Sequence, residues 1–486
     1  MTLYPLLVEN VALPLSDLVT TSRFWSQAKE LARQHSLGTA AMERLQRDQL
    51  QKLFDVAIRE THFWAERLPT NSVELTAITP VSKQEIERAF PDQIVNRSSD
   101  RTELRFSATN GTTQRMICVH DFAKRDSMRA AMIHTLRVAG YRVGMPVVEI
   151  PPNVCETVCG ELGESDDGLL NHLAQSVRRG ELRKASVWRD ARGKIERDWI
   201  FRKRNYSPFD HRGSNQPDKV LDEYIESLAN DRPHILKGLS TYLYQIAKRI
   251  LSRNDVSLNI PVLRTSGSQV TPKMKATIEA AFGGSYFNDY GTAELGPVAA
   301  ECEVRNGMHV FASQFIVEVV DQDLSPVSDG SLGEVLVTDL TNLAMPLIRY
   351  RVGDLGRTVH ERCACGSSFP RLWIEGRVQD AITDVAGNWV SSEVIADRLY
   401  AVPWLDQFQL VEQNDRSLEM TVVLDRSRNA EVGKQQQHSE LLAILHDLLG
   451  EHRDLRVLTS KSIASEPGGK FRWVKSFRAN RVEANA

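Results

Sequence analysis

The segment from Ser107 to Gln114 is the first part of the chain whose residue types could do chemistry. It reads Ser-Ala-Thr-Asn-Gly-Thr-Thr-Gln and lies between two short strand-like runs, 103–106 and 116–119. Gly111 would let the backbone approach an anion closely, and hydroxyl and backbone N–H groups could donate to phosphate oxygens. The loop lacks the Gly-Lys-Ser/Thr ending of a Walker motif. Taken alone, it is equally compatible with an ordinary turn between strands.

Two later segments carry residues suited to the other parts of a nucleotide. In residues 288–294, Asn-Asp-Tyr-Gly-Thr-Ala-Glu, an aromatic ring beside a glycine could form a flat slot for a base, and Glu294 could hold a hard cation. In residues 349–355, Asp354 could accept both hydroxyls of a ribose, and Arg377 could direct charge toward phosphate or ribose. The structural alternatives are a strand-to-loop turn and a charged sheet edge.

A fourth segment, Glu466-Pro-Gly-Gly-Lys-Phe-Arg472, places two glycines before Lys470. Such a loop could deliver a point charge to a ligand, although a glycine turn near a chain end is the plain alternative. All four segments fit one ligand, ATP.

The elements that must position these segments alternate between helix and strand, which predicts an α/β fold with a parallel sheet. Helical spacing covers 22–68, 122–139, 218–252 and about 271–282, and Ser82 with Glu85 predicts a capped helix start. Strands are expected at 146–150 and near 262–268, and they dominate 309–359. The basic stretch 178–204 is typical of a solvated surface, and it could also suit a phosphorylated cofactor or an acidic partner protein.

Composition places the chain among soluble globular proteins. It has 486 residues, which suggests two or three domains, and a net charge of −3, which gives no general field for nucleic acid or anionic membrane. We expect no signal peptide and no membrane span. Six cysteines are too sparse for a disulfide scaffold, so we expect a cytoplasmic protein with reduced thiols.

Four residues could form a closed metal site. Cys302, His309, Cys363 and Cys365 would supply three thiolates and one imidazole, the donor set of a structural tetrahedral zinc centre. Four unrelated residues are the alternative, because buried free cysteines are common. Cys155 and Cys159 have no partner in range and are expected to be core thiols.

In their order and spacing, the four segments resemble the adenylate-forming superfamily, most closely its phenylacetate–CoA ligase-like branch. Residues 109–115 stand where that branch carries Ser-Ser-Gly-Thr-Thr-Gly-Lys, and 290–294 where it carries Tyr-Gly-x-Thr/Ser-Glu. Residues 349–354 match its Arg-Tyr-x-x-Gly-Asp, and 376–380 match its Gly-Arg-x-x-Asp. Three departures stand out: Gln114 and Arg115 replace a glycine and a lysine, Ala293 replaces a hydroxyl residue, and Gly267-Ser-Gln replaces Gly-Ala-Glu.

The resemblance implies a role for each matching residue. Glu294 would hold Mg²⁺, Asp354 would bind the ribose with Arg377 nearby, Asp380 would be the hinge of a small mobile domain, and Lys470 would reach the carboxylate and α-phosphate. Some members of the branch also bind zinc at places corresponding to the Cys/His set. The phosphates, the adenine and the acyl carboxylate would be bound by Thr109, Asn110, Gly111, Thr112, Thr113, Gly267, Asp289, Tyr290, Gly291 and Thr292.

The implied architecture is a large domain at 1–378, which binds ATP and the acid and contains parallel-rich sheets and a β-rich part, with a small α+β domain at 379–486. The implied activity is acid activation through an acyl-adenylate and transfer to CoA, with an aromatic acid favoured by analogy. The acceptor could instead be a carrier protein, an amine or a hydroxyl that takes AMP. A non-catalytic nucleotide-binding homologue is a further alternative to an enzyme. For the oligomeric state, a homodimer is one possibility.

Overall fold

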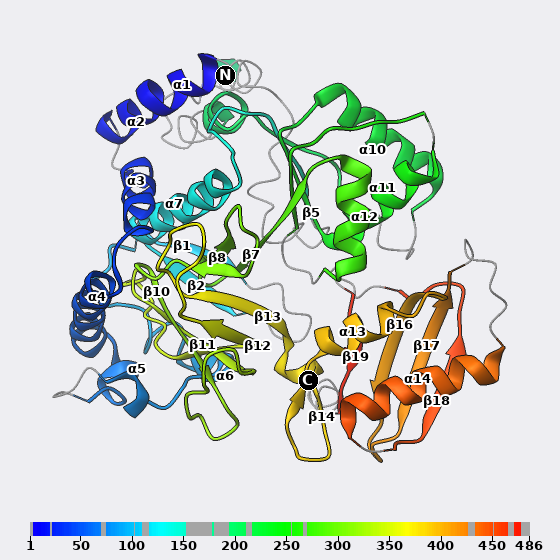
Figure 1. Cartoon of the computed structure of the whole chain (residues 1–486). Helices are drawn as coiled ribbons and strands as arrows, with labels where there is room; N and C mark the ends of the chain where they lie inside the picture. Colours follow the sequence, from blue (N-terminus) through cyan, green and yellow to red (C-terminus); the bar gives the residue numbers. More distant parts are fainter. Residues whose placement is uncertain are drawn as a thin grey trace.

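The computed structural model describes thirteen stretches of the chain. They are residues 3–19, 22–69, 74–101, 103–108, 116–151, 177–178, 194–209, 216–253, 255–265, 270–425, 433–450, 452–464 and 471–477. Within them the fold is α/β, with one large mixed sheet and one small mixed sheet (Figure 1). No described helix combines the length and hydropathy needed to cross a bilayer.

The large sheet has 11 strands in the order β10-β11-β12-β13-β9-β8-β7-β6-β5-β3-β4. From β4 to β7 neighbouring strands are parallel, and from β7 to β10 they are antiparallel. The predicted parallel-rich part and β-rich part therefore form one continuous sheet, in which the strand pairing changes from parallel to antiparallel at β7. Its strands are β3 (Val147–Ile150), β4 (Lys203–Asn205), β5 (Ile235–Gly238), β6 (Val262–Thr265), β7 (Ser285–Thr292), β8 (Gly296–Glu301), β9 (Met308–Val310), β10 (Phe315–Val320), β11 (Gly333–Asp339), β12 (Tyr350–Val359) and β13 (Arg371–Arg377).

The parallel part is covered on both faces, as apolar parallel strands require. Val148, Leu236 and Leu263 pack in one core with α10 (Asp218–Asp231), α11 (Ser240–Ser252) and α12 (Pro272–Phe282). Ile235 and Val262, one residue earlier on their strands, pack in another core with residues of α3 (Phe24–Gln34) and α7 (Phe122–Val138). The helical expectation for 218–252 was wrong at 235–238, where a short apolar run between two helices forms the buried strand β5.

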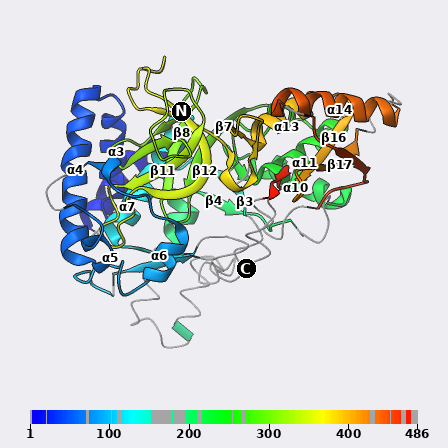
Figure 2. The ribbon, with the colours of Figure 1, turned by 90° about the horizontal axis from the view of Figure 1, so that it is seen from below.

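Helices of the first hundred residues line the antiparallel part. The expected helices of 22–68 are confirmed as α3, α4 (Thr39–Glu60) and α5 (His62–Ala65), and the capping box of Ser82 and Glu85 opens α6 (Lys83–Ala89). Seen from below, α3 and α4 stand on the side of the molecule away from the small sheet (Figure 2). Short elements of this region are η2 (Leu75–Ala77) and the pair β1 (Arg105–Ala108) and β2 (Ile117–His120), whereas η4 (Glu196–Ile200) contacts β4, at the edge of the parallel part.

The small sheet has the order β18-β17-β16-β19 and its own apolar core. Its elements begin after η5 (Val378–Asp380), so they lie in the predicted small domain, whose boundary at 378/379 stays a prediction. The strands of the sheet are β16 (Leu405–Glu412), β17 (Leu418–Leu424), β18 (Leu455–Thr459) and β19 (Val474–Lys475); α13 (Ser392–Tyr400) and α14 (Lys434–Leu449) pack with them, and β14 (Ile382–Thr383) and β15 (Trp389–Val390) form a separate two-stranded sheet.

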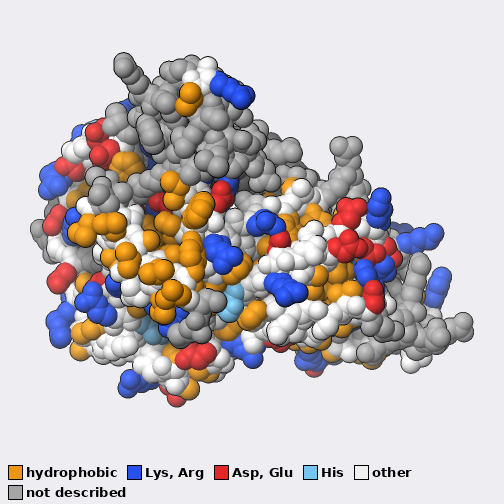
Figure 3. Space-filling view, turned by 90° about the horizontal axis from the view of Figure 1, so that it is seen from above, with side chains coloured by type: hydrophobic (Ala, Val, Ile, Leu, Met, Phe, Trp, Pro, Cys, Tyr) orange, Lys and Arg blue, Asp and Glu red, His pale blue; other side chains and the backbone are white. Residues whose placement is uncertain are grey.

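The first helical segment, α1 (Leu3–Leu7), η1 (Val8–Ala12) and α2 (Leu13–Val19), turns its apolar stripe outward. Figure 3, seen from above, shows apolar side chains gathered on this face of the molecule. The acids of the segment point inward instead: Glu9 accepts from the backbone N of Val143 at 3.1 Å, and Asp17 accepts from that of Ser26 at 2.7 Å. The exposed aliphatic side chains are Leu3, Leu7, Val11, Leu15 and Leu18.

Candidate functional site

Three predicted nucleotide-binding residues meet at one buried carboxylate. In the antiparallel pair β12–β13, Asp354 stands opposite Arg377, and Arg377 Nη1 donates to Asp354 Oδ1 at 3.0 Å. The hydroxyl of Tyr290, on β7, donates to Asp354 Oδ2 at 2.6 Å. Two consecutive strands, β12 and β13, and the distant strand β7 thus bring an aromatic ring, a carboxylate and a guanidinium together.

Electrostatics keep this group in its donor and acceptor roles. Burial and the neighbouring Asp354 raise the pKa of Tyr290 well above its ordinary value, so the phenol keeps its proton. The charge of Asp354 raises the pKa of Arg377. Gly353 lies in the left-handed region at φ +78°, and a Cβ there would lie 3.2 Å from Arg377 Nη2. Glycine therefore suits this position both for its backbone and for the room it leaves to the arginine.

Glu294 is buried at the turn between β7 and β8. Its Oε1 accepts from the hydroxyl of Tyr350 at 3.0 Å, and its backbone oxygen lies 2.9 Å from His120 Nε2. Burial lowers the pKa of Lys83, which senses the charges of both Glu294 and Arg377. Tyr350 belongs to one of the segments that the sequence analysis singled out. Lys83 was considered only as part of a helix start, so its place beside Glu294 was not predicted.

Gly291 and Thr292, which precede Glu294 in the same segment, both have structural roles in the turn between β7 and β8. A Cβ on Gly291 would lie 2.5 Å from the backbone oxygen of Gly296, so the β7–β8 turn admits no side chain there. Thr292 Oγ1 accepts from the backbone N of Leu295 at 3.3 Å, which closes the same turn. Whether Thr292 replaces the hydroxyl missing at Ala293 stays a prediction.

Several predicted site residues lie outside the described part of the chain. They are Thr109 to Thr113 with Gln114 and Arg115, Gly267 to Gln269, and Lys470. Cys155, Cys159 and most of the basic stretch 178–204 also lie outside it. The strands expected on either side of the 107–114 loop are confirmed as the antiparallel pair β1–β2.

Asp380, the predicted hinge, lies in η5 between the two sheets. Its Oδ1 accepts from Arg472 Nε at 3.1 Å, and the hydroxyl of Ser476 donates to the backbone oxygen of the adjacent Gln379. The end of the described chain is therefore tied to the connection that follows β13. Arg472 stands two residues after Lys470.

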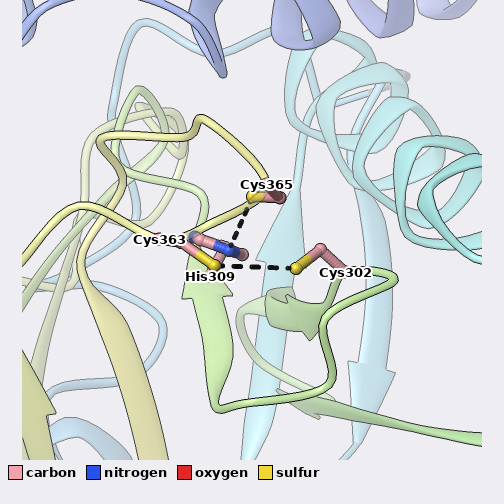
Figure 4. A group of neighbouring side chains, drawn as sticks. All are labelled: Cys302, His309, Cys363 and Cys365. Atoms are coloured by element: carbon pink, nitrogen blue, oxygen red, sulfur yellow. Dashed lines mark hydrogen bonds between the residues drawn. The ribbon is translucent and has the colours of Figure 1, made fainter.

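The four predicted metal ligands are brought together (Figure 4). Cys302 follows β8, His309 lies on β9, and Cys363 and Cys365 lie on the loop after β12. One potential ligand atom from each lies within 4.8 Å of all the others. Cys302 Sγ is 3.9 Å from Cys363 Sγ, and Cys365 Sγ is 3.4 Å from His309 Nε2.

This arrangement fits a tetrahedral zinc ion. Zinc–sulfur and zinc–nitrogen bonds of about 2.3 and 2.0–2.1 Å imply about 3.8 Å between sulfurs and about 3.6 Å between sulfur and nitrogen. His309 Nδ1 lies 3.2 Å from the backbone oxygen of Phe369, a contact that leaves Nε2 directed at the thiols. His35, at the end of α3, lies 4.0 Å from Cys365 Sγ through its Nε2. The sequence carries no signal for it, because it is so distant along the chain.

Comparison with known proteins identifies partial relatives. A phenylacetate–coenzyme A ligase of Thermus thermophilus is 31% identical over 241 residues, 47% of this chain and 54% of the relative. The Escherichia coli enzyme of the same name is 30% identical over 208 residues, 41% and 47% of the two chains. The chain thus spans about half the length of the curated relatives it matches. No protein-family profile matches it.

Solved structures share the fold over nearly the whole chain. A 2-hydroxyisobutyryl-CoA ligase in its postadenylation state, in complex with 2-HIB-AMP, superposes with a TM-score of 0.69 at 18% identity, covering 93% of this chain and 94% of that one. The structure of that ligase in its thioesterification state gives a TM-score of 0.55.

Proposed function

We propose, starting from the confirmed resemblance to the adenylate-forming superfamily and its phenylacetate–CoA ligase-like branch, that this chain is an ATP-dependent acid–thiol ligase. The observation that carries the proposal is the convergence of Tyr290 and Arg377 on Asp354, next to the buried Glu294. On this proposal, Tyr290 of β7 supplies an aromatic face, Asp354 of β12 accepts from the ribose, and Glu294, in the turn between β7 and β8, holds the cation. A structural ion pair alone would not need an aromatic partner in this position.

In the first step, the acid would attack the α-phosphate of ATP to give an acyl-adenylate and pyrophosphate. Asp354 would orient the ribose, with Arg377 holding one of its carboxylate oxygens, and residues 109–113 would bind the outer phosphates. Glu294 would hold Mg²⁺, which offsets the charge of the leaving pyrophosphate. Lys470 would stabilise charge at the α-phosphate. The protein's contribution is positioning and charge stabilisation rather than covalent chemistry.

In the second step, the small domain would turn about Asp380 and admit the thiol of CoA. This structure superposes better on the postadenylation form of the structural relative than on its thioesterification form, so it resembles the form that would precede such a turn. A carrier protein, an amine or a hydroxyl remains the alternative acceptor.

The Cys/His set would hold a structural zinc ion, with no open position for water because all four ligands come from the protein. It would tie the segment after Glu294 to the loop after β12. Both Glu294 and Asp354 lie close in sequence to these ties, so the ion would stabilise the register of the nucleotide-binding strands.

The decisive test is ATP–pyrophosphate exchange across aryl, alkyl, amino and dicarboxylic acids, with hydroxylamine trapping of any adenylate. Acid-dependent exchange is expected. A panel of acceptors, led by CoA, then identifies the second step. If the chain bound ATP but no acid supported exchange, the non-catalytic alternative would replace this proposal.

We also propose a homodimer through the outward stripe of α1–α2. The stripe carries no charge, so two copies could pack against each other along it without like-charge repulsion. Sedimentation of Leu15→Glu against the wild type tests this: a dimer that becomes a monomer supports it, and a monomeric wild type refutes it.

A further inference from the structure

A row of charged side chains crosses one face of the parallel strands. Glu149 on β3 stands opposite Lys237 on β5, and Lys237 stands opposite Arg264 on β6. On β7 the residue opposite Arg264 is Phe287, and Asp289 follows it two positions later, on the same face. Lys203 on β4 joins the row through an ion pair with Glu149.

The row interrupts an apolar face. Two residues before Lys237 and Arg264, the same face carries Ile235 and Val262, which are packed with residues of α3 and α7. On β5 and on β6, the residue that packs in the apolar core is therefore followed, at the next position on the same face, by a charged residue. Each face of a buried parallel sheet is normally apolar over its whole length, so the charged residues at these positions need an explanation.

The charges of the row do not balance. Lys203 Nζ lies 2.5 Å from Glu149 Oε2, and Arg264 Nη2 lies 3.2 Å from Asp289 Oδ2. Among the described carboxylates, Lys237 Nζ pairs with Glu149, which Lys203 already holds, at 3.7 Å. Within the described part of the chain, three cations of the row thus share two carboxylates. Burial alone would raise the pKa of Glu149, but Lys237 and Lys203 lower it to about 2, so the acid stays charged.

Polar atoms of the row are left without hydrogen bonds among the described residues. Arg264 is fully buried, yet its Nη2 makes no aligned hydrogen bond, and neither does Asp289 Oδ1. The other guanidinium nitrogen, Nη1, donates to the backbone oxygen of Thr135 at 3.0 Å, which fixes the side chain in place. The side chain of Lys237 keeps 28% of its surface exposed, so the row opens onto accessible space rather than closing in the core.

The row lies where open α/β sheets bind ligands. Its members stand at the carboxyl ends of parallel strands, next to β7, where the sheet changes from parallel to antiparallel. Asp289 directly precedes Tyr290, whose hydroxyl contacts Asp354. Because neighbouring residues of a strand point to opposite faces, Asp289 and Tyr290 leave β7 on opposite sides, and a ligand that reaches both would pass over the carboxyl ends of the strands.

We infer that this row recognises the far end of the acid substrate, and that the substrate is a dicarboxylic acid whose second carboxylate binds Lys237. The inference rests on the proposed function and names its substrate class. Among the described residues, the excess of one cation favours an anionic group over an ammonium group. An alkyl or aryl acid would desolvate Lys237 and Arg264 without supplying a partner, which is unfavourable for buried charge. The row therefore argues against the aromatic acid favoured by analogy.

The first experiment compares acids of equal length that differ only at the far end. Exchange of pyrophosphate into ATP is measured with succinate, butyrate and 4-aminobutyrate, with glutarate, valerate and 5-aminovalerate, and with phenylacetate. We expect kcat/KM for one of the dicarboxylates to exceed that of its methyl-ended analogue by about 10–100-fold, the scale of a hydrogen bond to a charged group. A preference for phenylacetate, a methyl-ended acid or an ammonium-ended acid would overturn the inference.

The second experiment changes Lys237 itself. Lys237→Met should lower kcat/KM for the preferred dicarboxylate by about 10–100-fold and leave that of the methyl-ended analogue unchanged or higher. Lys237→Arg should restore much of the preference, and Lys219→Met, on the exposed surface of α10, is the matched control. Equal losses for both acids would show a structural role and overturn the inference. Exchange with none of the acids would instead count against the proposed function, so the two failures are distinguishable.

Discussion

Removing one thiol of the Cys/His set should release zinc and destabilise the large sheet. We consider Cys302→Ala, because Cys302 and Cys363 are 61 positions apart and an ion between them closes the loop that contains β9 to β12. Treated as a cross-link, closure of a loop of this length contributes about 4 kcal/mol to the free energy of unfolding. At about 2.1 cal/mol/K of unfolding entropy per residue, a chain of 486 residues loses about 1 °C of Tm for each kcal/mol, so the expected fall is about 4 °C.

The assay measures zinc per chain by mass spectrometry of the purified protein and Tm by thermal unfolding, with and without a strong chelator. The wild type should carry about one zinc ion per chain, and a chelator should lower its Tm to that of Cys302→Ala. Cys118→Ala, a buried thiol outside the set, is the control and should keep its zinc. If wild-type protein without zinc had the same Tm as zinc-loaded protein, the cross-link reasoning would be refuted.

Three further substitutions test two predicted site residues and one buried acid on α13. Asp354→Asn should weaken ATP binding by about 10-fold or more, because it removes a charged acceptor, as isothermal titration would show; unchanged affinity would argue against a ribose contact. Lys470→Ala should slow adenylate formation by about 10²–10³-fold and thioester formation from added adenylate much less, so equal losses in both half-reactions would contradict its role. Burial and Asp397 raise the pKa of Glu393 from its ordinary 4.5 to about 8. The folded state then holds this proton more tightly than the unfolded state, so this group's contribution to stability should fall as pH rises from about 4.5 to 8. Glu393→Gln should remove that fall in denaturant titrations, and an unchanged pH profile would show that Glu393 does not cause it.

Tyr290, Asp354 and Arg377 could be picked out from the sequence because they lie in short local patterns, whereas their role in nucleotide binding stays a prediction. Tyr290 stands beside a glycine, and Asp354 follows Gly353, so each segment shows its chemistry in a few neighbouring residues. The structure adds the β12–β13 register that sets Asp354 opposite Arg377. The Cys/His set was likewise readable from residue type, although only the fold shows its four members meeting.

The charged row could not be predicted, for a physical reason. Glu149, Lys237 and Arg264 are single charges in strands of four residues, and each strand otherwise reads as an apolar run. Their meaning comes from the parallel register, which no local pattern encodes. The same brevity explains why β5 was mistaken for part of a helical region.

Strand β7 has a consequence for any attempt to redirect this protein. Its first half completes the parallel sheet, its second half begins the antiparallel one, and Asp289 and Tyr290 are joined by a single peptide bond. Under the proposed function, a residue that selects the acid and a residue that binds the nucleotide would therefore be neighbours on this strand and could not be exchanged separately. Replacing this strand with the corresponding strand of another protein would then change both acid selectivity and nucleotide binding. Substitutions on β5 would change acid selectivity and leave ATP binding as it is.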